Sequence, residues 1–233
     1  MVSVGTNSWP LVNFTSAWIE WPGTVWSSLR ARPHAVRRVT KGRMLFMQGD
    51  PMTEVFLVLE GRVRAVLLTR GGQEMHLAIV GTNGLIGESG AFIDGRHSIT
   101  AIASSNLLVC VFHIKELRAS VEVDGTTRGQ LLALMDSKLR IFAEHHVLLA
   151  HATAGQRVAH HLLDLANTFG RSTSEGVALN IDFTHGEMAC IAGLSRVMVS
   201  TLLAQWQRDG LLRKVSGWVI TDLDALRKLA ATT

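Results

Sequence analysis

The residues best suited to specific chemistry lie between positions 184 and 201, and that chemistry is the recognition of nucleic acid. Thr184 and Glu187 have the spacing of a capping box, in which Thr begins a helix and Glu bonds back to it. Gly193 suits a left-handed turn after that short helix, and Ser195 can cap a second, longer helix. Two helices joined by such a turn are the layout of a helix-turn-helix.

The second helix of this motif carries the residues that we expect to read DNA. Its first two turns would enter the major groove. There Arg196 can bind a guanine or a phosphate, and hydroxyl groups can do either more weakly. A predicted wing hairpin over 211–215 and 218–221 would add basic residues near the DNA backbone. The expected DNA contacts are Thr184, Ser195, Arg196, Val197, Ser200, Thr201, Arg213 and Lys214.

Overall charge supports this interpretation only weakly. The chain of 233 residues has a net charge of +4. Residues 151–233 carry eight Lys or Arg against seven Asp or Glu, so this region is nearly neutral. The DNA-binding prediction therefore depends on where the charges lie and not on bulk basicity.

The sequence lacks the motifs of disulfide frameworks, metal sites and enzymes. The two cysteines, Cys110 and Cys190, are far apart, which argues against a disulfide framework or a cysteine-ligated metal and suits a reducing cytoplasm. The barrel histidines His76, His97 and His113 lack the HxH spacing of a cupin metal site. No catalytic loop, signal peptide or membrane-length apolar run is recognisable. We therefore expect a cytoplasmic protein that is not an enzyme, with no catalytic residues, no metal site and no membrane partner.

Upstream, the sequence predicts a small antiparallel barrel. From residue 43 to 112, short apolar or alternating runs are separated by glycines, at the spacing of strands and turns. The Gly71-Gly72 pair supplies the positive φ angles of one hairpin. A short helix is expected over 24–32, and residues 1–24 are expected to form an irregular arm rich in Trp.

Residues 129–153 predict one long helix with two adjoining apolar stripes. One stripe has the spacing of a coiled-coil seam, and we expect it to pair with a second copy of the chain. The other, interrupted by Lys138 and His145, would cover the helix's own barrel. A hinge over 154–156 and a second helix over 157–168 would follow. The pairing stripe consists of Leu132, Met135, Leu139, Phe142, His146 and Leu149, and the second stripe of Leu131, Leu134, Ile141 and Leu148.

Motifs spread over this plan resemble the CRP/FNR superfamily of bacterial transcription regulators. The matching stretches are the barrel phrase over 48–61, the Gly-Glu turn over 85–90, a helix start over 157–166 and the helix-turn-helix over 187–200. Each stretch alone is weakly specific, but their order and spacing together are strongly specific.

The resemblance implies an α+β fold with an N-terminal antiparallel β-roll of the cyclic-nucleotide-binding type, a long dimerisation helix and a C-terminal winged helix-turn-helix. The domains would be the arm over 1–24, an effector-binding β-roll over 25–128, the dimerisation helix over 129–153 and the DNA-binding domain over 154–233. It also implies a sequence-specific regulator, a homodimer on a near-palindromic double-stranded operator. RNA polymerase would be a further partner of an activator.

Departures from the family argue against cyclic AMP as the effector. The Arg-Ser pair that holds its phosphate in the family corresponds here to Arg96-His97-Ser98, and the Thr-Ser pair that grips adenine corresponds to Phe142-Ala143. Phe and Ala cannot supply those hydrogen bonds. We expect instead a small organic or aromatic acid. The expected effector residues are Gly87, Glu88, Ser89, Arg96, His97, Ser98, Phe142 and His146.

Two alternatives stay open, and the operator is not carried over from the family. The dimer would bind DNA constitutively if Phe142 filled the pocket. It would be a haem-based gas sensor if a histidine among His76, His97, His145 and His146 ligated haem. The cysteines of the iron–sulfur oxygen sensors are absent from the N-terminal region. Val197 and Thr201 stand where the family usually carries Glu and Arg, which predicts a different operator sequence.

Overall fold

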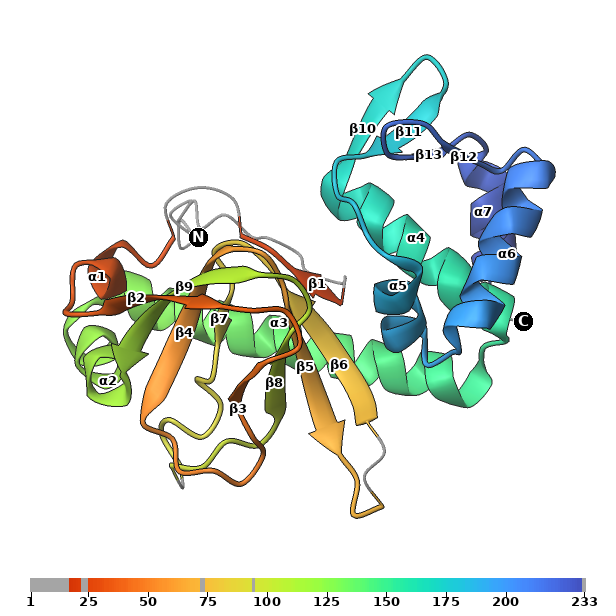
Figure 1. The fold of residues 1–233 in the computed structure, drawn as a ribbon. Coiled ribbons are helices and arrows are strands. Elements are labelled where there is room, and N and C mark those ends of the chain that lie inside the picture. Colours follow the sequence, from red (N-terminus) through yellow and green to blue (C-terminus); the bar gives the residue numbers. More distant parts are fainter. Residues whose placement is uncertain (1–16, 22–24, 72–73, 94, 232–233) are drawn as a thin grey trace, which may run out of the picture.

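Two domains lie side by side along one long helix in the computed structural model, which describes residues 17–21, 25–71, 74–93 and 95–231 (Figure 1). The N-terminal domain is a β-roll of two sheets, and its alternating runs turn their apolar side chains inward. One sheet has the order β1 (Trp18–Ile19), β6 (Glu74–Val80), β5 (Val63–Leu68), β8 (Thr100–Ala103) and β3 (Met44–Phe46). The other has the order β2 (Ala35–Val39), β9 (Leu107–His113), β4 (Glu54–Glu60) and β7 (Leu85–Ile86).

Part of the N-terminal arm is a strand and not irregular chain, which corrects the prediction for residues 1–24. β1 pairs with β6 in parallel, with Trp18 opposite Ile79. Trp18 is fully buried, and its ring centroid lies 6.3 Å from that of His161 in the C-terminal domain. This strand therefore joins the two domains. Residues 1–16 and 22–24, which include Trp9, lie outside the described residues.

The turn between β4 and β5 requires a glycine. Gly61 has a φ of +85°, and a Cβ there would lie 2.2 Å from the carbonyl oxygen of Asn106. The amide of Arg62, the next residue, donates to Ser105 Oγ at 3.0 Å. The turn thereby holds the start of β5 in place, so that the Arg62 side chain leaves the roll toward the C-terminal domain.

α1 (Ser27–Arg30) lies between β1 and β2, and two helices lead from the roll to the C-terminal domain: α2 (Ile114–Val123) and α3 (Gly125–His151). α3 begins before the predicted residue 129, because the Asp124 carboxylate accepts hydrogen bonds from the amides of Thr126 and Thr127 at 3.0 and 3.1 Å. It ends at His151, two residues before the predicted boundary.

The break after α3 falls at 152–153 and not at the predicted hinge over 154–156. Thr153 and Gln156 form a capping box that begins α4 (Ala154–Phe169), so residues 154–156 are its first turn. A hairpin follows α4, formed by β10 (Gly170–Thr173) and β11 (Gly176–Leu179). The remaining elements are α5 (His185–Ala192), α6 (Arg196–Arg208), β12 (Leu212–Lys214), β13 (Trp218–Ile220) and α7 (Leu223–Ala230).

Candidate nucleic-acid interface and effector cavity

α5 and α6 form the predicted helix-turn-helix. Both bonds of the first cap are present: Thr184 Oγ1 accepts from the Glu187 amide at 3.1 Å, and Glu187 Oε2 accepts from the Thr184 amide at 2.8 Å. Gly193 is left-handed with a φ of 61°. Ser195 caps α6 by accepting from the Met198 amide at 3.1 Å. Among the described residues no single helix is long and apolar enough to span a membrane, and α5 and α6 pass that test only as a pair bent by 109°.

The first two turns of α6 present one cation and several methyl groups on their exposed face. Arg196 is exposed, and Val197 is 75% exposed beside it. Ser200 Oγ lies 2.8 Å from Nδ1 of His185, and Thr201 Oγ1 donates to the carbonyl of Val197 at 3.0 Å. Both hydroxyls therefore already have partners within the protein. What α6 offers to a base edge is the guanidinium of Arg196, the methyls of Val197 and the methyl of Thr201.

The predicted wing residues are held by carboxylates of their own domain. Arg213 forms an ion pair with Glu175. Lys214 Nζ lies 3.0 Å from Asp182 Oδ1 and 4.8 Å from the ring centroid of Trp218. These contacts keep the wing close to neutral, in line with the charge balance of this part of the sequence.

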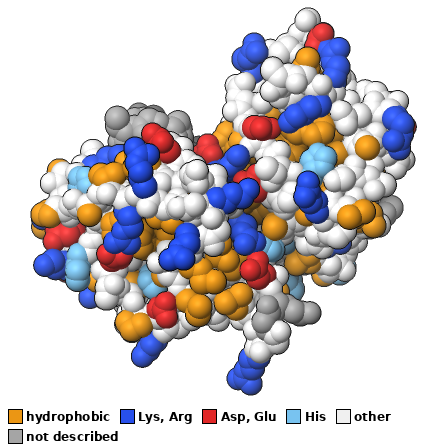
Figure 2. Space-filling view, in the orientation of Figure 1, with side chains coloured by type: hydrophobic (Ala, Val, Ile, Leu, Met, Phe, Trp, Pro, Cys, Tyr) orange, Lys and Arg blue, Asp and Glu red, His pale blue; other side chains and the backbone are white. Residues whose placement is uncertain are grey.

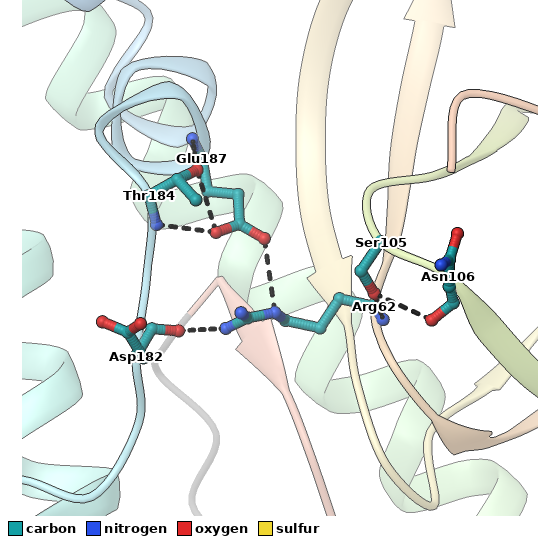
Figure 3. A network of polar contacts seen from close by, with 6 residues as sticks. All are labelled: Arg62, Ser105, Asn106, Asp182, Thr184 and Glu187. Carbon is teal, nitrogen blue, oxygen red and sulfur yellow. Dashed lines mark hydrogen bonds and ion pairs between the residues drawn. The ribbon is translucent and has the colours of Figure 1, made fainter. Parts of the chain in front are cut away.

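A polar network joins the roll to the first helix of the helix-turn-helix (Figure 3). Nε of Arg62 lies 3.3 Å from Glu187 Oε1, and a second guanidinium nitrogen donates to the carbonyl of Asp182. Glu187 is buried and also holds the cap of α5 through Thr184. We name the contact of Arg62 with Asp182 and Glu187 the Arg62 clamp. Figure 2 shows the groove between the domains, with Lys and Arg side chains gathered on its roll side.

The two apolar stripes of α3 face different surroundings: one packs against the rest of the chain and the other faces solvent. The stripe of Leu131, Leu134, Ile141 and Leu148 is buried against the roll and the C-terminal domain. In the other stripe, Leu132 is 65%, Leu139 67% and Phe142 41% exposed, and His146 is exposed. Leu149 is 40% exposed and also contacts the C-terminal domain, because its side chain lies 2.8 Å from the position that a Cβ on Gly193 would occupy, whereas Met135 is half-buried. We name Leu132, Met135, Leu139, Phe142 and His146 the outward stripe.

A cavity of about 190 Å³ lies between α3, the strands β5 and β6, and residues 88–89 and 98–99. Its walls are mostly apolar. The apolar wall residues are Ala65, Leu77, Ala78, Val80, Ile99, Met135, Leu139, Ile141 and Phe142, and the polar ones are Glu88, Ser89, Ser98 and Lys138.

Half of the predicted effector residues line this cavity: Glu88, Ser89, Ser98 and Phe142. The others, Gly87, Arg96, His97 and His146, lie elsewhere. The Arg96 guanidinium donates to the carbonyl of Gly49 at 2.7 Å, and the His97 ring stacks on Phe46 with centroids 3.8 Å apart. Burial lowers the pKa of His97, so its ring is neutral at physiological pH. A neutral ring cannot replace the arginine that holds a cyclic phosphate.

Lys138 is a site residue that sequence reasoning did not select. Its Nζ lies 2.6 Å from Glu88 Oε1 and 3.4 Å from the carbonyl of Leu85. Glu88 is 1% exposed, so the ion pair is buried at the contact between α3 and the roll. The signal in the sequence was a lysine interrupting the apolar stripe that faces the barrel.

A second group of titratable side chains lies where α3, α4 and β1 meet. Burial raises the pKa of Asp164 to about 8, and the nearby Glu144 adds to this shift. Burial lowers the pKa of His161 to about 3, and His160, His145 and Arg157 add to it. The Asp164 carboxylate lies 3.5 Å from Nε2 of His160. Within the described part of the chain, no three His, Cys, Asp or Glu side chains are arranged to hold a metal ion.

Comparison with known proteins identifies the family. The family model of the cyclic nucleotide-binding domain matches residues 36–124, and that of the Crp-like helix-turn-helix domain matches residues 156–229. The cyclic AMP receptor protein of Thermus thermophilus is 30% identical over 183 residues, which cover 78% of this chain and 82% of that protein. The chain belongs to the CRP/FNR family.

Solved structures agree with this CRP/FNR fold. A CooA mutant from Carboxydothermus hydrogenoformans superposes with a TM-score of 0.77 at 20% identity, covering 91% of this chain and 98% of that one. FixK2 from Bradyrhizobium japonicum superposes with a TM-score of 0.71 at 22% identity, covering 87% and 100%. The predicted β-roll, long helix and winged helix-turn-helix are confirmed. The protein is a DNA-binding transcription regulator with an effector-binding domain.

Proposed function

We propose that this CRP/FNR regulator is a homodimer whose DNA binding is controlled by a small molecule, other than cyclic AMP, held in the cavity beneath α3. The observation that carries the proposal is that α3 supplies the cavity wall, an exposed apolar stripe and the chain that leads to the helix-turn-helix. A ligand in the cavity that moves α3 would therefore act on the exposed apolar stripe and on the helix-turn-helix.

The outward stripe supports pairing with a second copy. Large apolar side chains repeat along it at coiled-coil spacing, and Leu132, Leu139 and Phe142 remain exposed in the single chain. A parallel pair of α3 helices would cover them and bring two α6 helices to one side of the dimer. Such a pair suits half-sites separated by about one turn of DNA, roughly 10 base pairs.

Three features argue against cyclic AMP as the ligand. The cavity of about 190 Å³ is smaller than typical pockets for small-molecule ligands, which measure roughly 300–1,000 Å³. The Lys138 ammonium already occupies one oxygen of Glu88. Phe142 lines the wall where hydrogen bonds to a purine would be needed. Haem would not be ligated in this cavity, because its described walls include no histidine, whereas His76 and His145 line a separate cavity.

The Arg62 clamp offers a route from the cavity to α5. Arg62 directly precedes β5, and β5 contributes Ala65 to the cavity wall, while the Arg62 guanidinium binds Glu187 in the cap of α5. We propose that the clamped arrangement is one of two states and that the ligand changes their populations by binding them unequally. A ligand that bound both states equally would leave DNA affinity unchanged.

Genomic selection tests the DNA-binding part of the proposal. The full-length protein is mixed with fragmented genomic DNA, bound fragments are sequenced, and the recovered site is measured by fluorescence anisotropy at two salt concentrations. The expected result is an inverted repeat whose affinity falls as salt rises, with a scrambled duplex as control. Failure to enrich any sequence, with and without cell extract, would overturn this part.

The same duplex tests control by a ligand. Operator affinity is measured with and without the low-molecular-weight fraction of a cell extract. The proposal is supported if the extract changes the operator affinity of the wild type but not that of Ala78→Leu, in which the added side chain fills the cavity. If the wild type binds the operator equally well with and without the extract, the constitutive dimer is favoured.

A further inference from the structure

His185 begins α5, the first helix of the helix-turn-helix, and contacts the second helix through one ring nitrogen. Its Nδ1 lies 2.8 Å from the Oγ of Ser200, which is one turn into α6. The other nitrogen, Nε2, has no hydrogen-bond partner among the described residues, and it is not buried. Because Ser200 holds the ring through Nδ1, Nε2 is the polar atom that His185 can offer to a partner outside the protein.

Positive charge surrounds this ring from two other elements. Arg196 begins α6 and Lys214 ends the wing strand β12, and the charges of both act on His185. The ring of Trp218 on β13 lies between two of these groups, with its centroid 6.1 Å from that of His185 and 4.8 Å from the Lys214 ammonium. Asp182 offsets part of this charge, because its Oδ1 lies 3.0 Å from Lys214 Nζ. An anion bound here would therefore face basic groups from α5, α6 and the wing.

These surroundings favour the neutral form of His185 in the protein without DNA. Burial lowers the pKa of its ring, and the positive charges of Arg196 and Lys214 lower it further. A neutral imidazole carries one N–H group, whereas an imidazolium donates from both nitrogens. A negative charge beside Nε2 would reverse the preference, because it would offset the two cations and accept a charge-assisted hydrogen bond.

DNA brings such a charge to this part of the molecule. In a helix-turn-helix the second helix enters the major groove, while the first crosses the phosphate backbone. His185 is the first residue of that first helix, and its hydrogen-bond partner lies on the second. A backbone phosphate is therefore the anion that the ring meets when the regulator binds its operator.

We propose that His185 takes up a proton when this regulator binds DNA, and that its imidazolium then donates from Nε2 to a backbone phosphate. This rests on the proposed function for the way the helix-turn-helix lies on DNA. Each half-site would gain one proton, so a dimer would gain two. Ser200 is a positioning residue, because its hydroxyl holds Nδ1 and thereby orients the ring.

The proposal fixes the sign of a pH effect on DNA binding. The complex holds more protons than the separate protein and DNA, so operator affinity must rise as pH falls. The rise begins near the pKa of His185 in the complex and ends near its lowered pKa in the protein without DNA.

Operator affinity measured against pH tests this on the full-length protein. Fluorescence anisotropy is followed at constant ionic strength, and wild type should bind about 10- to 100-fold more tightly at about pH 6 than at about pH 8. His185→Gln should lose most of this gain, because its amide does not titrate. His151→Gln makes the same change at an exposed histidine at the end of α3 and should keep the gain. Equal gains in the wild type and His185→Gln would overturn the proposal.

Calorimetry counts the protons directly. Binding enthalpies are measured at about pH 7 in buffers of different ionisation enthalpy, and their dependence on the buffer gives the number of protons taken up per dimer. We expect clear uptake in the wild type and in His151→Gln, and less in His185→Gln. Ser200→Ala should reduce the uptake as well, because the ring loses the bond that orients it. Uptake that is unchanged in His185→Gln would contradict the proposal.

A permanent cation separates the effect of charge from the loss of the ring. His185→Lys should bind the operator more tightly than the wild type at about pH 8 and should show little further gain at about pH 6. This comparison stands even if His185→Gln binds too weakly to measure. A pH dependence in His185→Lys equal to that of the wild type would overturn the proposal.

A random duplex separates this proposal from the proposed function. Phosphate contacts do not depend on base sequence, so the proton uptake should also appear on a random duplex, even if no operator is recovered. DNA binding without proton uptake would overturn this proposal and leave the proposed function standing. Absence of binding to either duplex would overturn both.

Discussion

Replacing Lys138 with Met tests whether the buried ion pair with Glu88 holds α3 on the roll. Lys138 Nζ lies 2.6 Å from Glu88 Oε1, and the two side chains are 16% and 1% exposed. At an effective dielectric constant of about 20, unit charges at this separation attract by about 6 kcal/mol before desolvation is counted. Removing Lys138 leaves the carboxylate buried and unpaired, which we expect to lower the free energy of unfolding by about 3–5 kcal/mol.

The expected loss is large enough to measure. Proteins commonly unfold with a free energy of about 5–15 kcal/mol, so Lys138→Met should lower Tm by on the order of 10 °C. Thermal and urea unfolding followed by circular dichroism would report it. Arg140→Met is the matched control on the same helix. Arg140 pairs with Asp136 at 2.8 Å, but both side chains are more than half exposed, so its Tm should match that of the wild type.

A second substitution completes the test. Glu88→Leu should lower the free energy of unfolding by less than Lys138→Met does. The Lys138 side chain that remains in Glu88→Leu is long enough to carry its charge toward solvent. The double variant Glu88→Leu/Lys138→Met should recover most of the loss, since a buried ion pair replaced by apolar groups of similar volume is often neutral in stability. The reasoning would be refuted if Lys138→Met were as stable as Arg140→Met. It would also be refuted if the double variant lost as much free energy of unfolding as the two single variants together.

Four further changes test other parts of the molecule. Arg196→Ala should weaken operator binding about 10- to 100-fold in fluorescence anisotropy, because it loses one bidentate contact to a base. An unchanged affinity would show that Arg196 does not contact the operator. Uracil in place of a contacted thymine should weaken wild-type binding about 4-fold, the worth of one methyl group, and Val197→Ala should be insensitive to the exchange; equal sensitivity of both proteins would contradict the methyl contact. Leu139→Glu should sediment as a monomer with unchanged circular dichroism, because Leu139 is 67% exposed in the single chain; a dimeric variant would contradict pairing through the outward stripe. The pKa of Asp164 is raised from 3.8 to about 8, so its contribution to stability is complete below the lower value and is lost as pH rises through the higher one. Relative to Asp164→Asn, the wild type should lose about 1.4 kcal/mol of unfolding free energy per pH unit from about pH 5 to 8 in urea titrations, whereas parallel profiles would contradict a buried neutral carboxyl.

Periodicity and capping chemistry predicted the elements whose cause is local. The two stripes of α3 follow from 3.6-residue spacing, and their burial matches the prediction except at Met135, which is half-buried and lines the cavity. Thr184 and Ser195 begin α5 and α6 as their side-chain chemistry requires. The break before α4 was predicted too late, although Thr153 and Gln156 carry the same capping-box spacing that identified α5.

The effector cavity was only partly predictable, because its walls depend on tertiary register. The chain between Ser89 and Ser98 is a loop, and no local pattern says which of its side chains turn inward. A single bridge between Pro51 and Arg96 directs this part of the loop toward β3 and β4, which takes Arg96 and His97 away from the cavity. Lys138 could be found only by asking what a lysine on the barrel-facing stripe would pair with.

Met135, Leu139 and Phe142 belong both to the outward stripe and to the cavity wall, which has a consequence for control. A second α3 packed on that stripe would close the cavity on the side where these residues are exposed. Ligand binding and dimerisation would then be linked through the same side chains. Thermodynamic linkage makes the two effects reciprocal. If the ligand raises the dimerisation constant, the dimer must bind the ligand more tightly than the monomer does, and the same factor sets the size of both effects. Protein concentration should therefore shift ligand affinity, and Leu132→Glu should remove that shift, because Leu132 is an exposed residue of the outward stripe that does not line the cavity.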